Sequence, residues 1–162
     1  MNIKNNFTPE EWKSLLKSPM LVSYAVAGAA PSGENDFIQE MSAVADAIIE
    51  GGQQAPQDSL VAAVVADIVA NADDEGRGAT EKISVKEVKG RALEHCQSVA
   101  DLLRTKVGAE EADAYKRWLV SVARKVASAA KEGGFLGFGG TQVSESEKTT
   151  IGEIESALGV QA

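Results

Sequence analysis

The chain has very few of the residues that form covalent or metal cross-links. Its 162 residues include one cysteine, Cys96, and one histidine, His95. A single cysteine excludes an intramolecular disulfide and is typical of a reducing compartment, so we expect a cytoplasmic protein. A zinc site of the usual kind is excluded as well, because zinc needs several cysteine or histidine ligands.

Aromatic and positively charged residues are scarce too. Aromatic residues make up 5% of the chain and hydrophobic residues of all kinds 44%, so we expect a core of mainly Ala, Val, Ile and Leu. The 16 Lys and Arg residues against 24 Asp and Glu residues give a net charge of −8. This charge disfavours binding to nucleic acids and to anionic lipid headgroups. Neither a secretory signal nor an apolar run long enough to span a bilayer is expected.

Apolar residues recur every three or four positions along most of the chain, which is the spacing of amphipathic helices. Thr8 and Glu11 form a capping box that predicts a first helix, and Pro19 is expected to end it because proline removes a backbone hydrogen bond. Gly51-Gly52 is expected to end the third helix. Another capping box, Ser144 and Glu147, predicts the start of the last helix, and Gly159 is expected to end that helix in the left-handed conformation. No segment alternates as a half-buried strand would, so we predict one all-α domain, residues 1–162, with about seven helices. Their expected ranges are about 8–18, 19–30, 36–50, 57–72, 84–107, 109–131 and 144–158.

Two parts of the chain resemble each other. Val26–Ala30 matches Val126–Ala130, and three apolar positions of each following helix match as well: Met41, Val44 and Ile48 with Ile151, Ile154 and Leu158. The match predicts a compact bundle in which two similar helical hairpins, at about 19–50 and 109–159, surround a central apolar helix at about 57–72. The alternative is that Ala-rich helices resemble each other by composition alone.

The second hairpin also resembles the TerB-like family associated with tellurite resistance. The similar features are the small-residue helix 122–130, the turn Glu132-Gly133, and the tail from Ser144 to Gly159. The resemblance covers about a third to a half of the chain. It implies an all-helical bundle, a non-enzymatic role in a membrane-associated stress response, and calcium binding at the hairpin turns. The chain departs from the family at these turns, which lack the usual Asp-Gly with further carboxylates, so the resemblance supports the fold more strongly than a metal site.

The inserted loop of the second hairpin is the first candidate site. It contains Phe135, Leu136 and Phe138 within a run of glycines. Three apolar side chains on such a loop can enter the groove of a protein partner or a membrane interface, so we predict a partner-binding role. The alternative is that they fold back onto the core, because the chain has only four phenylalanines.

Acidic turns are the second candidate site. Asp73 and Glu75 follow Asn71 at the spacing of a calcium-binding EF-hand loop, but the position of the closing glutamate is occupied by Lys82. A solvated acidic loop is the alternative there. Three other carboxylates that we consider as metal ligands lie near the start of a helix, where they also complement the helix dipole: Glu34, Asp36 and Glu40. A fourth, Glu132, lies at the turn of the second hairpin.

No catalytic constellation is recognised in the sequence. His95 and Cys96 are adjacent, so on a helix they point about 100° apart and cannot act as a nucleophile and its base. Cys96 falls on the apolar side of its helix and is expected to be buried. We therefore expect a non-catalytic protein-interaction module of a stress-response type that needs no cofactor. The alternative is a calcium-binding sensor that uses the acidic turns.

Overall fold

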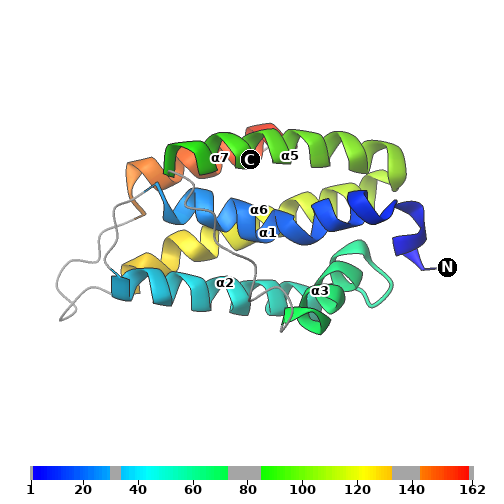
Figure 1. The fold of residues 1–162 in the computed structure, drawn as a ribbon, viewed down its shortest axis with the longest axis horizontal. Helices are drawn as coiled ribbons and strands as arrows, with labels where there is room; N and C mark the ends of the chain where they lie inside the picture. Colours follow the sequence, from blue (N-terminus) through cyan, green and yellow to red (C-terminus); the bar gives the residue numbers. More distant parts are fainter. Residues whose placement is uncertain (1, 30–33, 73–84, 133–142, 161–162) are drawn as a thin grey trace.

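The computed structural model describes residues 2–29, 34–72, 85–132 and 143–160. These segments form a short 3-10 helix and six α-helices and contain no strand, so the all-α prediction is confirmed (Figure 1). The elements are η1 (Ile3–Asn6), α1 (Pro9–Ala27), α2 (Glu34–Gln54), α3 (Leu60–Ala70), α5 (Val85–Lys106), α6 (Ala109–Glu132) and α7 (Glu145–Leu158). None of the described helices is both long and apolar enough to cross a membrane.

The helices pack in three layers. In Figure 1, α1 and α6 form the middle layer, with α5 and α7 on one side and α2 and α3 on the other. The helix α6 holds the middle position because a stripe of its side chains is buried along most of its length: Ala112, Tyr115, Leu119, Val122, Ala123 and Val126. The apolar residues Val126 and Ile154, predicted as core positions, are both buried.

The apolar helix α3 lies at the edge of the bundle rather than in the centre that the sequence predicted. Its side chain Val69 is 54% exposed, and Ala66 and Ala70 also face solvent. A helix whose outer side is largely alanine exposes little apolar area, so it does not need neighbours all round. On its inner side, Leu60 and Val64 are fully buried.

The helix α1 continues through Pro19, and the predicted break at this residue is wrong. Proline has no amide hydrogen, so the carbonyl oxygen of Leu15 loses its normal partner within the helix. This oxygen instead accepts a hydrogen bond of 2.7 Å from the hydroxyl of Tyr115 on α6. The neighbouring helix thus replaces the missing bond, and the two helices expected at 8–18 and 19–30 are one.

The predicted end of a helix at Gly51-Gly52 is also wrong, because α2 continues to Gln54. These two glycines have no side chain and therefore allow α3 and α6 to pack closely against α2. A Cβ atom on Gly52 would lie 2.6 Å from Val65 Cγ1 on α3, and one on Gly51 would collide with the indole ring of Trp118 on α6. The pair therefore lets three helices approach one another.

The predicted caps agree with the structure wherever it describes them. Thr8 and Glu11 cap α1 with reciprocal hydrogen bonds of 3.2 and 2.7 Å, and Ser144 and Glu147 do the same for α7. Gly159 ends α7 in the left-handed region, with φ 69°. These local signals depend on neighbouring residues only, which is why the sequence revealed them.

Candidate functional site

Most of the sequence-predicted site residues lie outside the described part of the chain. This holds for the apolar loop residues Phe135, Leu136 and Phe138, and for the acidic residues Asp73 and Glu75. Glu34, Asp36, Glu40 and Glu132 belong to α2 and α6, but their side chains are not described. Among the described side chains, no group of three or more His, Cys, Asp and Glu residues is placed to hold a metal ion. The loop and calcium predictions therefore stay predictions.

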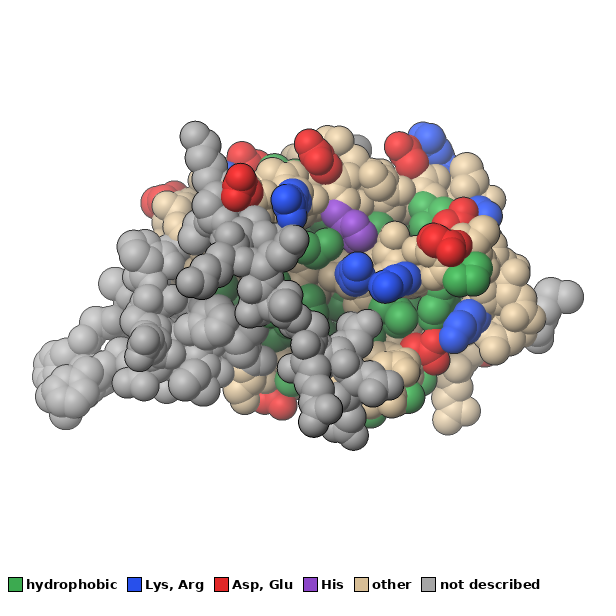
Figure 2. Space-filling view, viewed as in Figure 1, with side chains coloured by type: hydrophobic (Ala, Val, Ile, Leu, Met, Phe, Trp, Pro, Cys, Tyr) green, Lys and Arg blue, Asp and Glu red, His purple; other side chains and the backbone are tan. Residues whose placement is uncertain are grey.

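A polar cluster that the sequence did not reveal joins α1 and α5. The Nε2 atom of His95 on α5 lies 3.0 Å from the carbonyl oxygen of Ser14 and 2.9 Å from the hydroxyl oxygen of Ser18. The Ser18 hydroxyl also donates to the Ser14 carbonyl over 2.9 Å. Ser18 is fully buried, whereas the histidine side chain reaches the surface in Figure 2. A serine and a histidine at this distance raise the question of nucleophilic catalysis.

The hydrogen-bond pattern argues against a nucleophile–base pair. The carbonyl oxygen of Ser14 can only accept, so the tautomer of His95 that satisfies this contact carries its hydrogen on Nε2. A base would need its free electron pair on this same nitrogen to take the proton of Ser18. The Ser18 hydroxyl instead donates its hydrogen to the carbonyl and accepts from Nε2. The cluster therefore fixes α5 against α1 and is structural.

Burial sets the ionisation of the titratable groups in this region. It lowers the pKa of His95, an effect opposed by the hydrogen bond to the Ser14 carbonyl and reinforced by the positive charge of Lys17. Burial also raises the pKa of the Cys96 thiol to about 12 and raises the pKa of Tyr115 well above its usual value. At neutral pH the thiol and the phenol are uncharged, so neither is an activated nucleophile.

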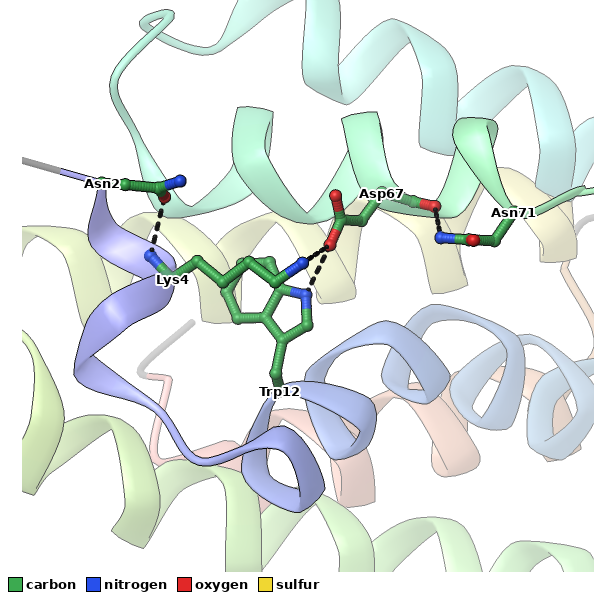
Figure 3. Close-up of polar contacts among 5 residues, drawn as sticks. All are labelled: Asn2, Lys4, Trp12, Asp67 and Asn71. Carbon is green, nitrogen blue, oxygen red and sulfur yellow. Dashed lines mark hydrogen bonds and ion pairs between the residues drawn. The ribbon is translucent and has the colours of Figure 1, made fainter.

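A second polar cluster holds the N-terminal segment on α3 (Figure 3). Asp67, the only charge of α3, accepts a hydrogen bond of 2.8 Å from Trp12 Nε1 and forms an ion pair with Lys4. The Lys4 hydrogen bond, with that of Trp12, holds the pKa of Asp67 below its usual value against the effect of burial. Lys4 Nζ also lies 5.4 Å from the centroid of the Trp12 ring. Because the two charged side chains of the cluster, Lys4 and Asp67, pair with each other, we assign it a structural role as well.

The feature best suited to binding is a groove between α5, α6 and α7, here called the α5–α7 groove. It consists of two hollows of about 530 and 400 Å³ that share Gln97, Ser156 and Ala157. Small side chains line much of both hollows: Ala100, Ala109, Ala112, Gly152, Ser156, Ala157 and Gly159. The helices α5 and α7 run side by side in the same direction along it (Figure 1). Because the sequence pattern gives no information on how two helices pair, this groove was not predicted.

The groove is open to solvent and has charged edges. Gln97, Asp101 and Ser156 are exposed, whereas Ala112 and Leu158 form a buried floor. Along one edge, Arg104 and Asp101 form an ion pair of 3.0 Å. A Cβ atom added to Gly152 would meet no atom within 4 Å, so the groove has free space above α7.

The chain was compared with protein-family models, with curated proteins and with solved structures, and none of the three comparisons finds a match.

Proposed function

We propose that the protein is a non-catalytic module that binds a helical segment of another protein in the α5–α7 groove. The observation that carries this proposal is the continuous open groove, lined by small side chains, between two helices that lie side by side. Small residues let the axis of a third helix come close, because its ridge of side chains fits between those of its neighbours. Grooves of this kind hold amphipathic helices in many protein complexes.

Two further observations support binding of a protein segment over other activities. A small-molecule site usually encloses most of its ligand, whereas exposed residues form much of the wall of this groove. In the one serine–histidine contact in the described part of the chain, the serine hydroxyl donates to the Ser14 carbonyl and not, as catalysis would need, to the histidine. The resemblance to the TerB-like family supports a stress-response setting, and Phe135, Leu136 and Phe138 stay candidates for additional partner contacts.

The proposal can be tested by filling the groove. Gly152→Leu places a side chain in the groove, and Gly90→Leu on α5 is the matched control, because a Cβ atom there also meets no atom within 4 Å. Both changes replace a helical glycine and are expected to preserve folding. The full chain and both variants are used to capture proteins from cells that produce it, and each captured protein is then titrated in purified form. We expect a protein that binds the wild type and Gly90→Leu but not Gly152→Leu. Equal binding to all three chains contradicts the proposal.

A further inference from the structure

One lysine in the α5–α7 groove forms no ion pair within the described part of the chain. Lys116 on α6 lines the larger hollow, is half-buried, and forms no hydrogen bond or ion pair with any described residue. The acidic residues on the same hollow do not serve it. Asp101 is paired with Arg104, and Asp113, one turn before Lys116 on α6, is exposed and forms no ion pair with it.

The other half-buried basic residues of the described part are all paired. They are Lys89, which forms an ion pair with Glu153 on α7, and Lys106, whose Nζ lies 3.0 Å from Glu11 on α1. Each of these lysines thus meets a carboxylate from another helix. A charge that is partly removed from water is stabilised by such a partner, whereas a fully exposed charge needs none. Lys116 is the exception to this pattern, and it is the one that lines the larger hollow.

We infer that the helical segment bound in the groove carries an aspartate or glutamate that pairs with Lys116, next to an apolar residue that packs on the partly exposed apolar side chains of the groove. This inference rests on the proposed function and deepens it. The apolar contact is offered by Ala100, Val107 and Ala157, which line the same hollow as the lysine and are partly exposed. A helix that carries an acidic and an apolar side chain three or four positions apart presents both on one face, so the first can pair with Lys116 while the second contacts the apolar lining.

The inference selects one class of ligand among the negatively charged ones. An anionic membrane is flat and meets the whole molecule, whose net charge of −8 repels it. A side chain that enters the larger hollow meets mainly the charges within about 8 Å at physiological salt, and those that line it balance: Arg104 and Lys116 against Asp101 and Asp113. A carboxylate on a protein segment therefore reaches the lysine without facing the acidic remainder of the surface.

A library of displayed helical peptides tests the inference with defined ligands. Peptides are selected on the full-length wild type, and those that lose binding to Gly152→Leu are kept as groove binders. We expect these peptides to be enriched in Asp or Glu at one position near an apolar residue. Selection on Lys116→Glu is expected to favour Lys or Arg at that position. The matched control is Arg117→Glu, which makes the same charge change at an exposed neighbour on α6 that does not line the groove.

One selected peptide, made synthetically, then measures the pairing. Replacing its acidic residue with the amide is expected to weaken binding to the wild type and to Arg117→Gln by about fivefold or more, and to leave binding to Lys116→Gln unchanged. If groove binders show no acidic preference, or if the amide weakens binding equally on all chains, the inference fails while the proposed function stands. If no selected peptide is sensitive to Gly152→Leu, the proposed function fails, and the inference with it.

Discussion

The hydroxyl of Tyr115 on α6 donates to the carbonyl oxygen of Leu15 on α1 over 2.7 Å, at the position where Pro19 cannot donate. The hydroxyl belongs to a fully buried side chain, and the oxygen lies one turn before the proline. A bond between two helices thus compensates for a bond lost within one helix. The proline and the tyrosine, although they are far apart in the sequence, form one structural unit.

Tyr115→Phe is expected to lower the free energy of unfolding by about 1–3 kcal/mol, because it leaves a buried carbonyl oxygen without a donor. Urea denaturation followed by circular dichroism measures the change. The same substitution in a Pro19→Ala background is expected to cost less, since the new alanine can donate its own amide hydrogen to Leu15. Equal costs in the two backgrounds would show that the hydroxyl does not replace the missing backbone bond.

Alanine is expected to have opposite effects on stability at a packed glycine, Gly51 between α2 and α6, and at an open one, Gly90 on α5. Gly51→Ala is expected to destabilise the fold by about 1–3 kcal/mol, because the new methyl group collides with the indole ring of Trp118 in a well-packed core. Gly90→Ala, on an open side of α5, is expected to stabilise it by about 0.5–1 kcal/mol through the better helix propensity of alanine. Thermal unfolding of both variants checks the signs. A stabilised Gly51→Ala variant contradicts the close approach of the two helices.

The pKa of His95 predicts how stability changes in mild acid. Burial lowers this pKa in the folded state from its ordinary value of 6.5, so the unfolded chain binds the proton more readily. The free energy of unfolding is therefore expected to fall as the pH drops below about 6.5, and to stop falling once the pH is below the folded-state pKa. Urea denaturation between about pH 8 and pH 5 measures the change.

His95→Gln is the control for this pH range, because His95 is the only histidine in the chain. The variant is expected to show a flatter dependence between about pH 7 and pH 5. Acidic groups contribute at lower pH: the pKa of Asp67 and that of Glu11 are lowered in the folded state, so the stability that they provide is lost as the pH falls below their ordinary values of 3.8 and 4.5 toward the folded-state values. An equal slope in the wild type and in His95→Gln contradicts the assignment.

Sequence reasoning was successful where the structure depends on near neighbours. The caps at Thr8 and Ser144, the left-handed Gly159 and the buried stripe through Cys96 follow from spacings of three or four residues. It failed at Pro19 and Gly51, where contacts with a residue of another helix allow the helix to continue. A proline with apolar periodicity on both sides was the one available signal, since it leaves a carbonyl oxygen that must find a distant donor.

The α5–α7 groove belongs to the same class of features that the sequence does not reveal. Its residues come from three helices, and their alanines, serines and glycines occur in the sequence as ordinary helix positions. Only the packing of the helices brings Gln97 of α5 beside Ser156 of α7. The same holds for Lys116, since neither its burial nor its lack of a partner among the described residues can be read from charge spacing on α6.

The burial of Cys96 predicts that its thiol is unreactive in the folded protein. The side chain is 1% exposed and burial raises its pKa to about 12, so the thiolate that attacks thiol reagents is nearly absent at about pH 8. Ellman's reagent is expected to label the folded chain only as fast as the protein opens, and to label it fully and at once in urea. Tyr115→Phe is expected to label faster than the wild type, because a less stable fold opens more often. Immediate labelling of the folded wild type would place Cys96 outside the core and undo the arrangement of α5 against α1 and α6.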